Sequence, residues 1–259
     1  MNYMNKKFIF SIISLGLPLI LWHIAASMLA QSYFLPKPLE VAKSLVNLFY
    51  VFHFLGGIKI SLIRVLGGFC LATILAIPLG ILMGVNKNIE NIFEPFLAFV
   101  RYTPIPAFIP LFILWFGIGE TEKLVVIFAG VFFQLTLMVS NSVSRIPKEL
   151  IEAAQTLGAG NWQIIKQVVV PWSKPLIFDD LRINMGWAWS SLVLAEVVGS
   201  TTGIGYVIIQ SQRLLKTPEV MAAIVTVGIL GLLSDIIFKK AYKLLFPWAD
   251  KLENLYARN

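Results

Sequence analysis

The stretch LIRVLGGFCLATILAIPLGILMG, residues 62–84, decides the fold class of this chain. It is almost wholly apolar and long enough for an α-helix to cross the ~30 Å hydrocarbon core of a bilayer. Five further apolar segments lie at residues 8–29, 93–116, 123–143, 176–198 and 220–245. The strands of a β-barrel would instead alternate apolar and polar residues over about ten positions. We therefore predict an all-α, multi-pass membrane protein with about six transmembrane helices.

The overall composition leads to the same class. Of 259 residues, 58% are hydrophobic and 14% are charged, and the mean hydropathy is +0.79. Soluble domains carry about 25% charged residues. These values exclude a soluble enzyme, a disordered chain and a secreted disulfide scaffold, and Cys70 is the only cysteine. Because the first apolar segment is longer than that of most signal peptides, we predict that it forms a first membrane helix.

The distribution of charge predicts the orientation of the chain in the membrane. The formal net charge is +7. With the N-terminus in the cytoplasm, the inner segments hold more Lys and Arg than the outer segments, as cytoplasmic loops do. We therefore predict that both termini are cytoplasmic. No basic stripe with interleaved aromatic residues lies outside the apolar segments, so we expect membrane lipid and no nucleic acid as a partner.

The third apolar segment is irregular. Pro104, Pro106 and Pro110 interrupt it. Proline removes a backbone donor and clashes with the preceding helical turn. We therefore predict a kinked or broken helix whose freed carbonyl groups face protein or water. In the second segment, by contrast, Gly80 and Gly84 have the G-x-x-x-G spacing of a close contact between helices.

Several charged or aromatic residues lie inside the apolar segments. A charge at the bilayer centre costs about 2.5–3.5 kcal/mol on insertion scales, so it should face the helix bundle or a cavity. One interpretation is a translocation pathway that attracts an anion, with Arg101, Arg182, Trp189 and Glu196 as candidate residues. The other is a set of structural ion pairs, with Trp189 as a packing residue. Both interpretations fit the sequence.

The motifs of the common enzyme classes are missing. The stretch nearest to a G-x-x-x-x-G-K-[ST] phosphate loop, residues 117–123, lacks the second glycine before the lysine. His23 and His53 are isolated, so no zinc site is expected. Ser190 and Ser191 have no His or Lys partner at a helical spacing. We therefore predict no catalytic residue, no metal site and no cofactor bound by this chain.

The connection at residues 144–175 has the pattern of two short helices around a glycine turn. Pro147 suits a first helical turn, and Glu149 suits the positive end of the helix dipole. Gly158 is placed to end the first helix, and Pro171 is expected to end the second. One apolar face repeats at the i, i+3, i+4 and i+7 positions Leu150, Ala153, Ala154 and Leu157. This face must pack either on the chain's own membrane domain or on a soluble partner.

Part of this connection resembles a known family signature. Glu152, Ala153 and Ala154 are followed by Gly158 and then Pro171 at the spacing E-A-A-x₃-G-x₉-I-x-L-P. That signature marks the permease subunits of bacterial ATP-binding-cassette importers. The chain departs from it at Val168 and Val170, where the family has Ile and Leu. Other stretches resemble the nitrate/sulfonate/taurine-type branch, among them residues 101–106, 110–120, 186–189 and 203–206.

The resemblance implies a fold, a set of partners and residue roles. The expected fold is the type I, MetI-like permease, with residues 1–60 as a first helix and external connection, 61–249 as the permease core and 250–259 as a cytoplasmic tail. The expected assembly is a homodimer in the bacterial inner membrane, with two ATPase subunits that bind ATP and Mg²⁺ and an external binding protein. The coupling loop would use Glu152, Ala153, Ala154, Gly158, Ala159, Gly160 and Pro171.

Alternatives remain for the substrate and for the mode of transport. Within the family, the main candidate substrate is a small anion such as nitrate, taurine, an alkanesulfonate or bicarbonate. Thiamine-precursor pyrimidines and guanidinium-like cations are the alternative substrates. A channel that needs no ATPase is the alternative from a different class of protein.

Overall fold

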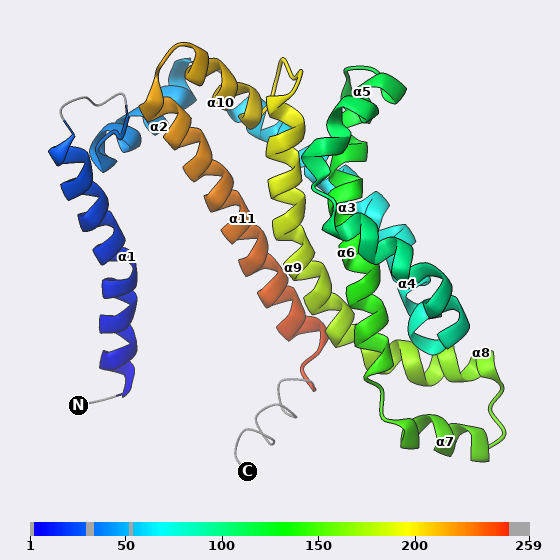
Figure 1. Ribbon diagram of the computed structural model, residues 1–259. Helices are drawn as coiled ribbons and strands as arrows, with labels where there is room; N and C mark the ends of the chain where they lie inside the picture. The colour runs from blue at the N-terminus through cyan, green and yellow to red at the C-terminus, as the bar shows by residue number, and fades with distance from the viewer. Residues whose placement is uncertain (1–2, 30–33, 52–53, 249–259) are drawn as a thin grey trace. The chain divides into compact units, whose positions relative to one another are not determined.

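The computed structural model describes residues 3–29, 34–51 and 54–248, and every regular element in these ranges is helical (Figure 1). This confirms the all-α class. The predicted tail at 250–259 and the two chain ends lie outside the described residues. In chain order the elements are α1 (Tyr3–Met28), α2 (Pro38–Val51), α3 (Phe54–Val85), α4 (Lys87–Tyr102), the 3-10 helix η1 (Ile105–Phe108), α5 (Ile109–Phe116), α6 (Glu120–Ser144), α7 (Lys148–Thr156), α8 (Asn161–Ile164), the π-helix η2 (Ile165–Val169), α9 (Val170–Val197), α10 (Ile204–Arg213) and α11 (Thr217–Leu245).

The helices form two compact units. The first comprises residues 1–60 and 201–228, and the second, here called the core unit, comprises residues 61–200 and 229–259. Within the first unit, Glu219 holds the turn from α10 into α11, because it accepts hydrogen bonds from Ser211 Oγ at 3.0 Å and from Lys216 Nζ at 3.0 Å. The hairpin and the pocket described below lie wholly in the core unit.

The number of membrane-spanning helices agrees only in part with the prediction of six. Among the described residues, α3, α6 and α11 are long and apolar enough to cross a membrane, and the pair α4 and η1–α5 adds a fourth if it counts as one span. The predicted segment 176–198 lies in α9, whose N-terminal half carries charged side chains. In α1 the side chains are described only from Gly16, and the apolar stretch Gly16–Met28 is shorter than a full span, so the predicted segment 8–29 lies partly outside the described side chains.

The third apolar segment is broken, as predicted. Helix α4 ends at Tyr102, and Thr103 (φ −81°, ψ 128°) and Pro104 (φ −65°, ψ 119°) are extended. A residue before proline favours this conformation because the proline ring clashes with its helical form. The helices on the two sides of the break differ in direction by 91°. Pro110 does not interrupt α5, because it lies in the first turn, where no backbone donor is needed.

Helix α6 is the central helix of the core unit, and Figure 1 shows it between α9 and α4. Helix α3 approaches α6 through two glycines. A Cβ atom at Gly80 would lie 2.8 Å from the carbonyl oxygen of Thr136, and one at Gly84 would lie 2.8 Å from that of Ser140. This confirms the close contact predicted from the G-x-x-x-G spacing. The buried apolar side chains of α6 include Val126, Ile127, Val131, Leu135, Val139 and Val143.

Candidate functional site

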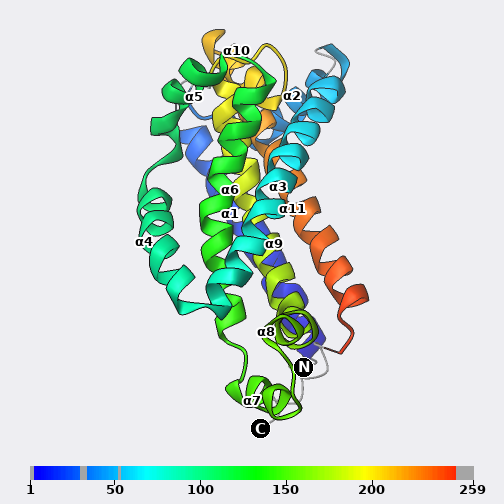
Figure 2. The same ribbon diagram turned by 90° about the vertical axis from the view of Figure 1, so that its right-hand side faces the viewer.

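A helical hairpin of α7 and α8 extends beyond the end of α6 (Figure 2). Pro147 (φ −58°, ψ 128°) precedes the first residue of α7 and turns the chain away from α6. Glu149 lies in the first turn of α7, where a carboxylate interacts favourably with the helix dipole. In the core unit, the hairpin lies at the same end as the C-terminal end of α11 (Figure 1).

The predicted glycine turn is present at the end of α7. Gly158 has a φ of +83°, a conformation that glycine adopts at little cost because it has no Cβ atom. Its N–H donates to the carbonyl oxygen of Gln155 at 2.9 Å, and the N–H of Ala159 donates to that of Ala154 at 3.0 Å. These bonds satisfy carbonyl groups that the end of a helix leaves unpaired. The sequence therefore fixes where α7 ends.

The second half of the hairpin differs from the prediction, because Pro171 does not end a helix. Gly160 begins α8, and its N–H donates to Gln163 Oε1 at 2.9 Å. The chain then passes through the π-turn Ile165–Val169, where the Val170 N–H bonds to the Ile165 carbonyl, and continues as α9. Pro171 lies in the first turn of α9. A π-turn widens the helix locally and so accommodates a proline that lacks an N–H and needs extra room.

The predicted apolar face of α7 is mostly uncovered, and its first residue, Leu150, is 42% exposed. Ile151, which was not on the predicted face, is half-buried, and together with the buried Ile164 it borders a cavity next to the turn between α3 and α4. Leu157 is 88% exposed and Trp162 is 71% exposed. Glu152 and Ala153 are also exposed, and Ala154 is half-buried. The hairpin therefore presents apolar and acidic side chains that nothing in the described part of the chain covers.

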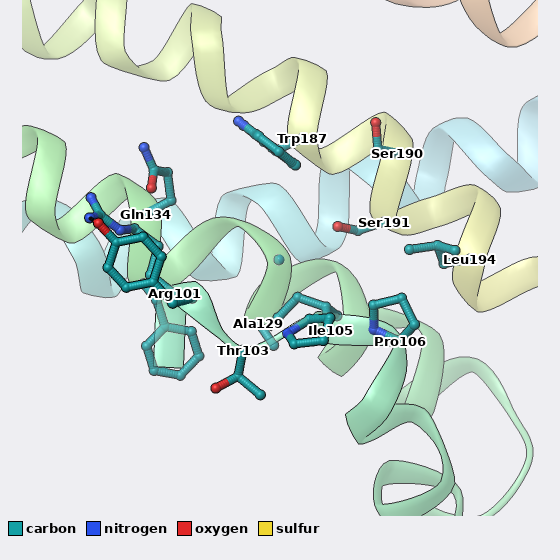
Figure 3. Close-up of a pocket in the computed structure, with 14 residues that line it drawn as sticks. Arg101, Thr103, Ile105, Pro106, Ala129, Gln134, Trp187, Ser190, Ser191 and Leu194 are labelled. Atoms are coloured by element: carbon teal, nitrogen blue, oxygen red, sulfur yellow. Dashed lines mark hydrogen bonds between the residues drawn. The ribbon is translucent and has the colours of Figure 1, made fainter. Parts of the chain in front are cut away.

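A second candidate site is a pocket between α4, α6 and α9 (Figure 3). Its volume is about 270 Å³. Gly130 forms part of its wall. A Cβ atom at this position would collide with Ser191, so the glycine allows α9 to approach α6. The lining residues are Arg101, Tyr102, Thr103, Pro104, Ile105, Pro106, Ala129, Gly130, Phe133, Gln134, Trp187, Ser190, Ser191 and Leu194.

Of the four predicted pathway residues, only Arg101 lines this pocket. Trp189 is buried, and its Nε1 donates to Ser234 Oγ on α11 at 3.1 Å. Arg182 forms ion pairs with Asp179 at 3.1 Å and Asp235 at 3.4 Å.

The fourth, Glu196, is fully buried and belongs to a polar cluster near the start of α6. Glu196 Oε1 accepts a hydrogen bond from Arg64 Nη1 at 2.7 Å and another from Ser61 Oγ at 2.7 Å. Arg64 also donates its Nε to Glu120 Oε2 at 2.7 Å. This cluster joins α3, α6 and α9 at the end of α6 that is opposite the hairpin.

Gln134 was not among the sequence candidates, although it lines the pocket. The available signal was a carboxamide at the middle of an otherwise apolar stretch, FFQLTL at residues 132–137. Ser191 and Trp187 also line the pocket, where the packing of α9 on α6 places them.

The helices long enough to cross a membrane, the exposed hairpin and the pocket between helices define a multi-pass membrane protein. The family model described as "binding-protein-dependent transport system inner membrane component" matches residues 76–251. The chain belongs to this family. It is thus a multi-pass permease of the inner membrane, and the ATPase of such an importer is a separate subunit, so the predicted non-enzymatic role is confirmed.

Sequence similarity to curated relatives extends over most of the chain. A probable ABC transporter permease protein of Brucella abortus (strain 2308) is 38% identical over 84% of this chain and 87% of its own length. The taurine transport system permease protein TauC of Escherichia coli (strain K12) is 31% identical over 90% of this chain and 86% of its own length. The formylaminopyrimidine transport permease protein ThiX of Halalkalibacterium halodurans is 28% identical over 90% of this chain and 93% of its own length.

A solved structure shows the fold. A chain of the MetNI methionine ABC transporter, in an inward-facing conformation, matches with a TM-score of 0.68 and 20% sequence identity, over 74% of this chain and 95% of that chain. The predicted MetI-like fold is therefore confirmed at the level of chain topology.

Proposed function

We propose that this chain is one of two identical membrane subunits of an importer that takes up a small organic sulfonate or a similar oxyanion. An external binding protein delivers the solute, and two ATPase subunits dock on the α7–α8 hairpins. The ATPase subunits hold ATP and Mg²⁺, and this chain carries no cofactor of its own. Both chain ends and the hairpin lie in the cytoplasm.

The exposed hairpin is the observation that carries this proposal. Its helix α7 presents Glu152 and Ala153 outward, next to the exposed side chains of Leu157 and Trp162. Small alanine side chains permit a close approach of a partner's backbone, and exposed apolar residues beside a carboxylate are typical of a docking surface. In our proposal Glu152 forms a polar contact at the rim, and Ala153 and Ala154 form the close contact.

Alternating access gives the hairpin its mechanical role. When ATP closes the two ATPase subunits, the two hairpins are drawn together and the pathway opens outward, and hydrolysis reverses the movement. Such coupling requires the hairpin to bind the ATPase with different free energies in the two states of the permease.

Gly158 offers a test of docking with a matched control. No atom lies within 4 Å of a Cβ atom at this position, so a side chain of any size meets open space within the described chain. Gly158→Ala therefore changes only the backbone strain, about 1–2 kcal/mol for a left-handed residue. Gly158→Leu adds bulk at the surface where the ATPase would dock.

We expect both variants to reach the membrane in equal amounts. Gly158→Leu should co-purify with less ATPase subunit than Gly158→Ala and should lose ATP-driven import. Import by Gly158→Leu at the rate of Gly158→Ala would contradict the docking proposal. A purified wild-type permease that forms no complex with an ATPase subunit would favour an ATPase-independent channel instead.

The substrate class is tested on the external binding protein. TauC is a taurine permease by name, and this supports a sulfonate. ThiX is a formylaminopyrimidine permease by name, so a pyrimidine is the second candidate. A calorimetric screen of the partner binding protein with taurine, an alkanesulfonate, nitrate, bicarbonate and a formylaminopyrimidine separates these candidates. Tight binding of the pyrimidine alone would refute the oxyanion.

A further inference from the structure

The three arginines inside helices of the core unit differ in their counterions. Arg64 contacts the carboxylates of Glu120 and Glu196. Arg182 contacts those of Asp179 and Asp235. Arg101 forms no ion pair with any carboxylate in the part of the chain that the structure describes, and its hydrogen-bond partner there is the Tyr102 hydroxyl at 2.9 Å.

The position of Arg101 makes this difference informative. Ala129 and Gln134, which line the same pocket, lie near the middle of α6, a helix long enough to span the membrane. The pocket is therefore at mid-span depth. An arginine at this depth cannot face lipid without a penalty, so it must face protein or a water-filled cavity. None of the residues that line the pocket is acidic.

The residues around Arg101 suit an oxyanion. The guanidinium carbon lies 4.7 Å from the centroid of the Tyr102 ring, so the aromatic ring restricts the side chain. Arginine has five N–H donors in a planar fork that matches groups with several oxygen atoms. In Figure 3, Gln134 and the indole nitrogen of Trp187 lie on the Arg101 side of the pocket, and the Ser191 hydroxyl points inward. These side chains supply neutral donors.

We propose that Arg101, with Gln134, Trp187 and Ser191, forms an anion-selective contact site on the translocation pathway. Its ligand is the sulfonate group, or an oxyanion of the same shape, of the transported solute. This inference rests on the proposed function and adds the residues that contact the cargo. The pocket volume of about 270 Å³ lies just below the range of about 300–1,000 Å³ that is usual for ligand sites, which suits a small solute.

The site can be tested by changing the charge of the side chain at position 101. The parent is a Cys70→Ser chain, assembled with its ATPase and binding protein in proteoliposomes, with labelled taurine as the probe. Arg101→Cys removes the guanidinium, and methanethiosulfonate reagents then attach either a positive aminoethyl or a negative sulfonatoethyl group. Lys240→Cys, an exposed position on α11, is the matched control for loss of one positive charge.

We expect Arg101→Cys to lower the maximal rate of import by roughly tenfold or more, because a charge-assisted hydrogen bond is lost. The KM for taurine should stay the same, because the binding protein sets it. Attachment of the aminoethyl group should raise the import rate several-fold above that of unmodified Arg101→Cys, and attachment of the sulfonatoethyl group should not. Lys240→Cys should import at the parental rate with or without either reagent.

Two results would overturn the proposed site. One is import by Arg101→Cys at the parental rate, and the other is equal recovery with the positive and the negative reagent. ATP hydrolysis stimulated by the binding protein is measured in parallel. If it persists while the site fails either test, the importer function stands and the anion contact is wrong. If the parent complex hydrolyses no ATP, the proposed function itself fails.

Discussion

Removal of the Glu196 carboxylate should destabilise the core unit far more than removal of the Glu120 carboxylate, although both contact Arg64. Glu196 is fully buried, whereas the Glu120 side chain is 64% exposed. Removal of one partner from a buried ion pair costs about 3–5 kcal/mol, and without Glu196 the buried Arg64 keeps only the exposed carboxylate of Glu120. An exposed partner contributes about 0.2–1 kcal/mol. Glu196→Ala should therefore cost several times more than Glu120→Ala.

The two variants can be compared by thermal unfolding of the purified chain in detergent. At about 2–4 °C per kcal/mol for a chain of this size, we expect the midpoint to fall by roughly 6–20 °C for Glu196→Ala and by at most about 4 °C for Glu120→Ala. Glu196→Gln should lie between them, because its amide oxygen still accepts from Ser61 and Arg64 but carries no charge. Equal shifts for the two alanine variants would refute the reasoning from burial.

Two further predictions concern packing in the helices. Gly80→Ala should destabilise the protein by about 1–3 kcal/mol, because its Cβ atom would press on the Thr136 carbonyl. The control Gly228→Ala meets no atom within 4 Å and should be neutral or slightly stabilising. Unfolding midpoints that rank the two variants the other way would contradict the α3–α6 contact. Trp189→Phe should destabilise by about 1 kcal/mol, because the hydrogen bond to Ser234 is lost; an unchanged midpoint in the same assay would show that this bond adds nothing.

Local features were predictable because their causes are local. The proline-rich break after Tyr102 follows from the geometry of proline, and the turn at Gly158 follows from the freedom of glycine to adopt a positive φ. The signature that begins at Glu152 is local as well, since it lies within residues 152–171 of one connection. The continuation of the helix through Pro171 was missed, because a π-turn has no clear sequence pattern.

The partners of the charged residues were not predictable, because they come from distant parts of the chain. Arg64 and Glu196 are separated by 132 positions, and nothing in either helix alone indicates that they meet. The sequence offered a pathway and a structural ion pair as alternatives for Arg101, Arg182 and Glu196. Among the described residues, Arg182 and Glu196 have ion-pair partners and Arg101 lines a pocket, and this difference leads to the proposal for Arg101.

The continuous helix at Pro171 bears on how movement at the hairpin would reach the pocket. Helix α6 leads into the hairpin at Ser144, and α8 leads out of it through the π-turn into α9 without an intervening loop. Helices α6 and α9 carry Gln134 and Ser191, which both line the pocket. A loop at residue 171 would absorb a displacement of α8, whereas a helix transmits it along its axis. We therefore expect a pull on the hairpin to change the spacing of α6 and α9 at the pocket, with Gly130 as the contact where the two helices have least room to shift.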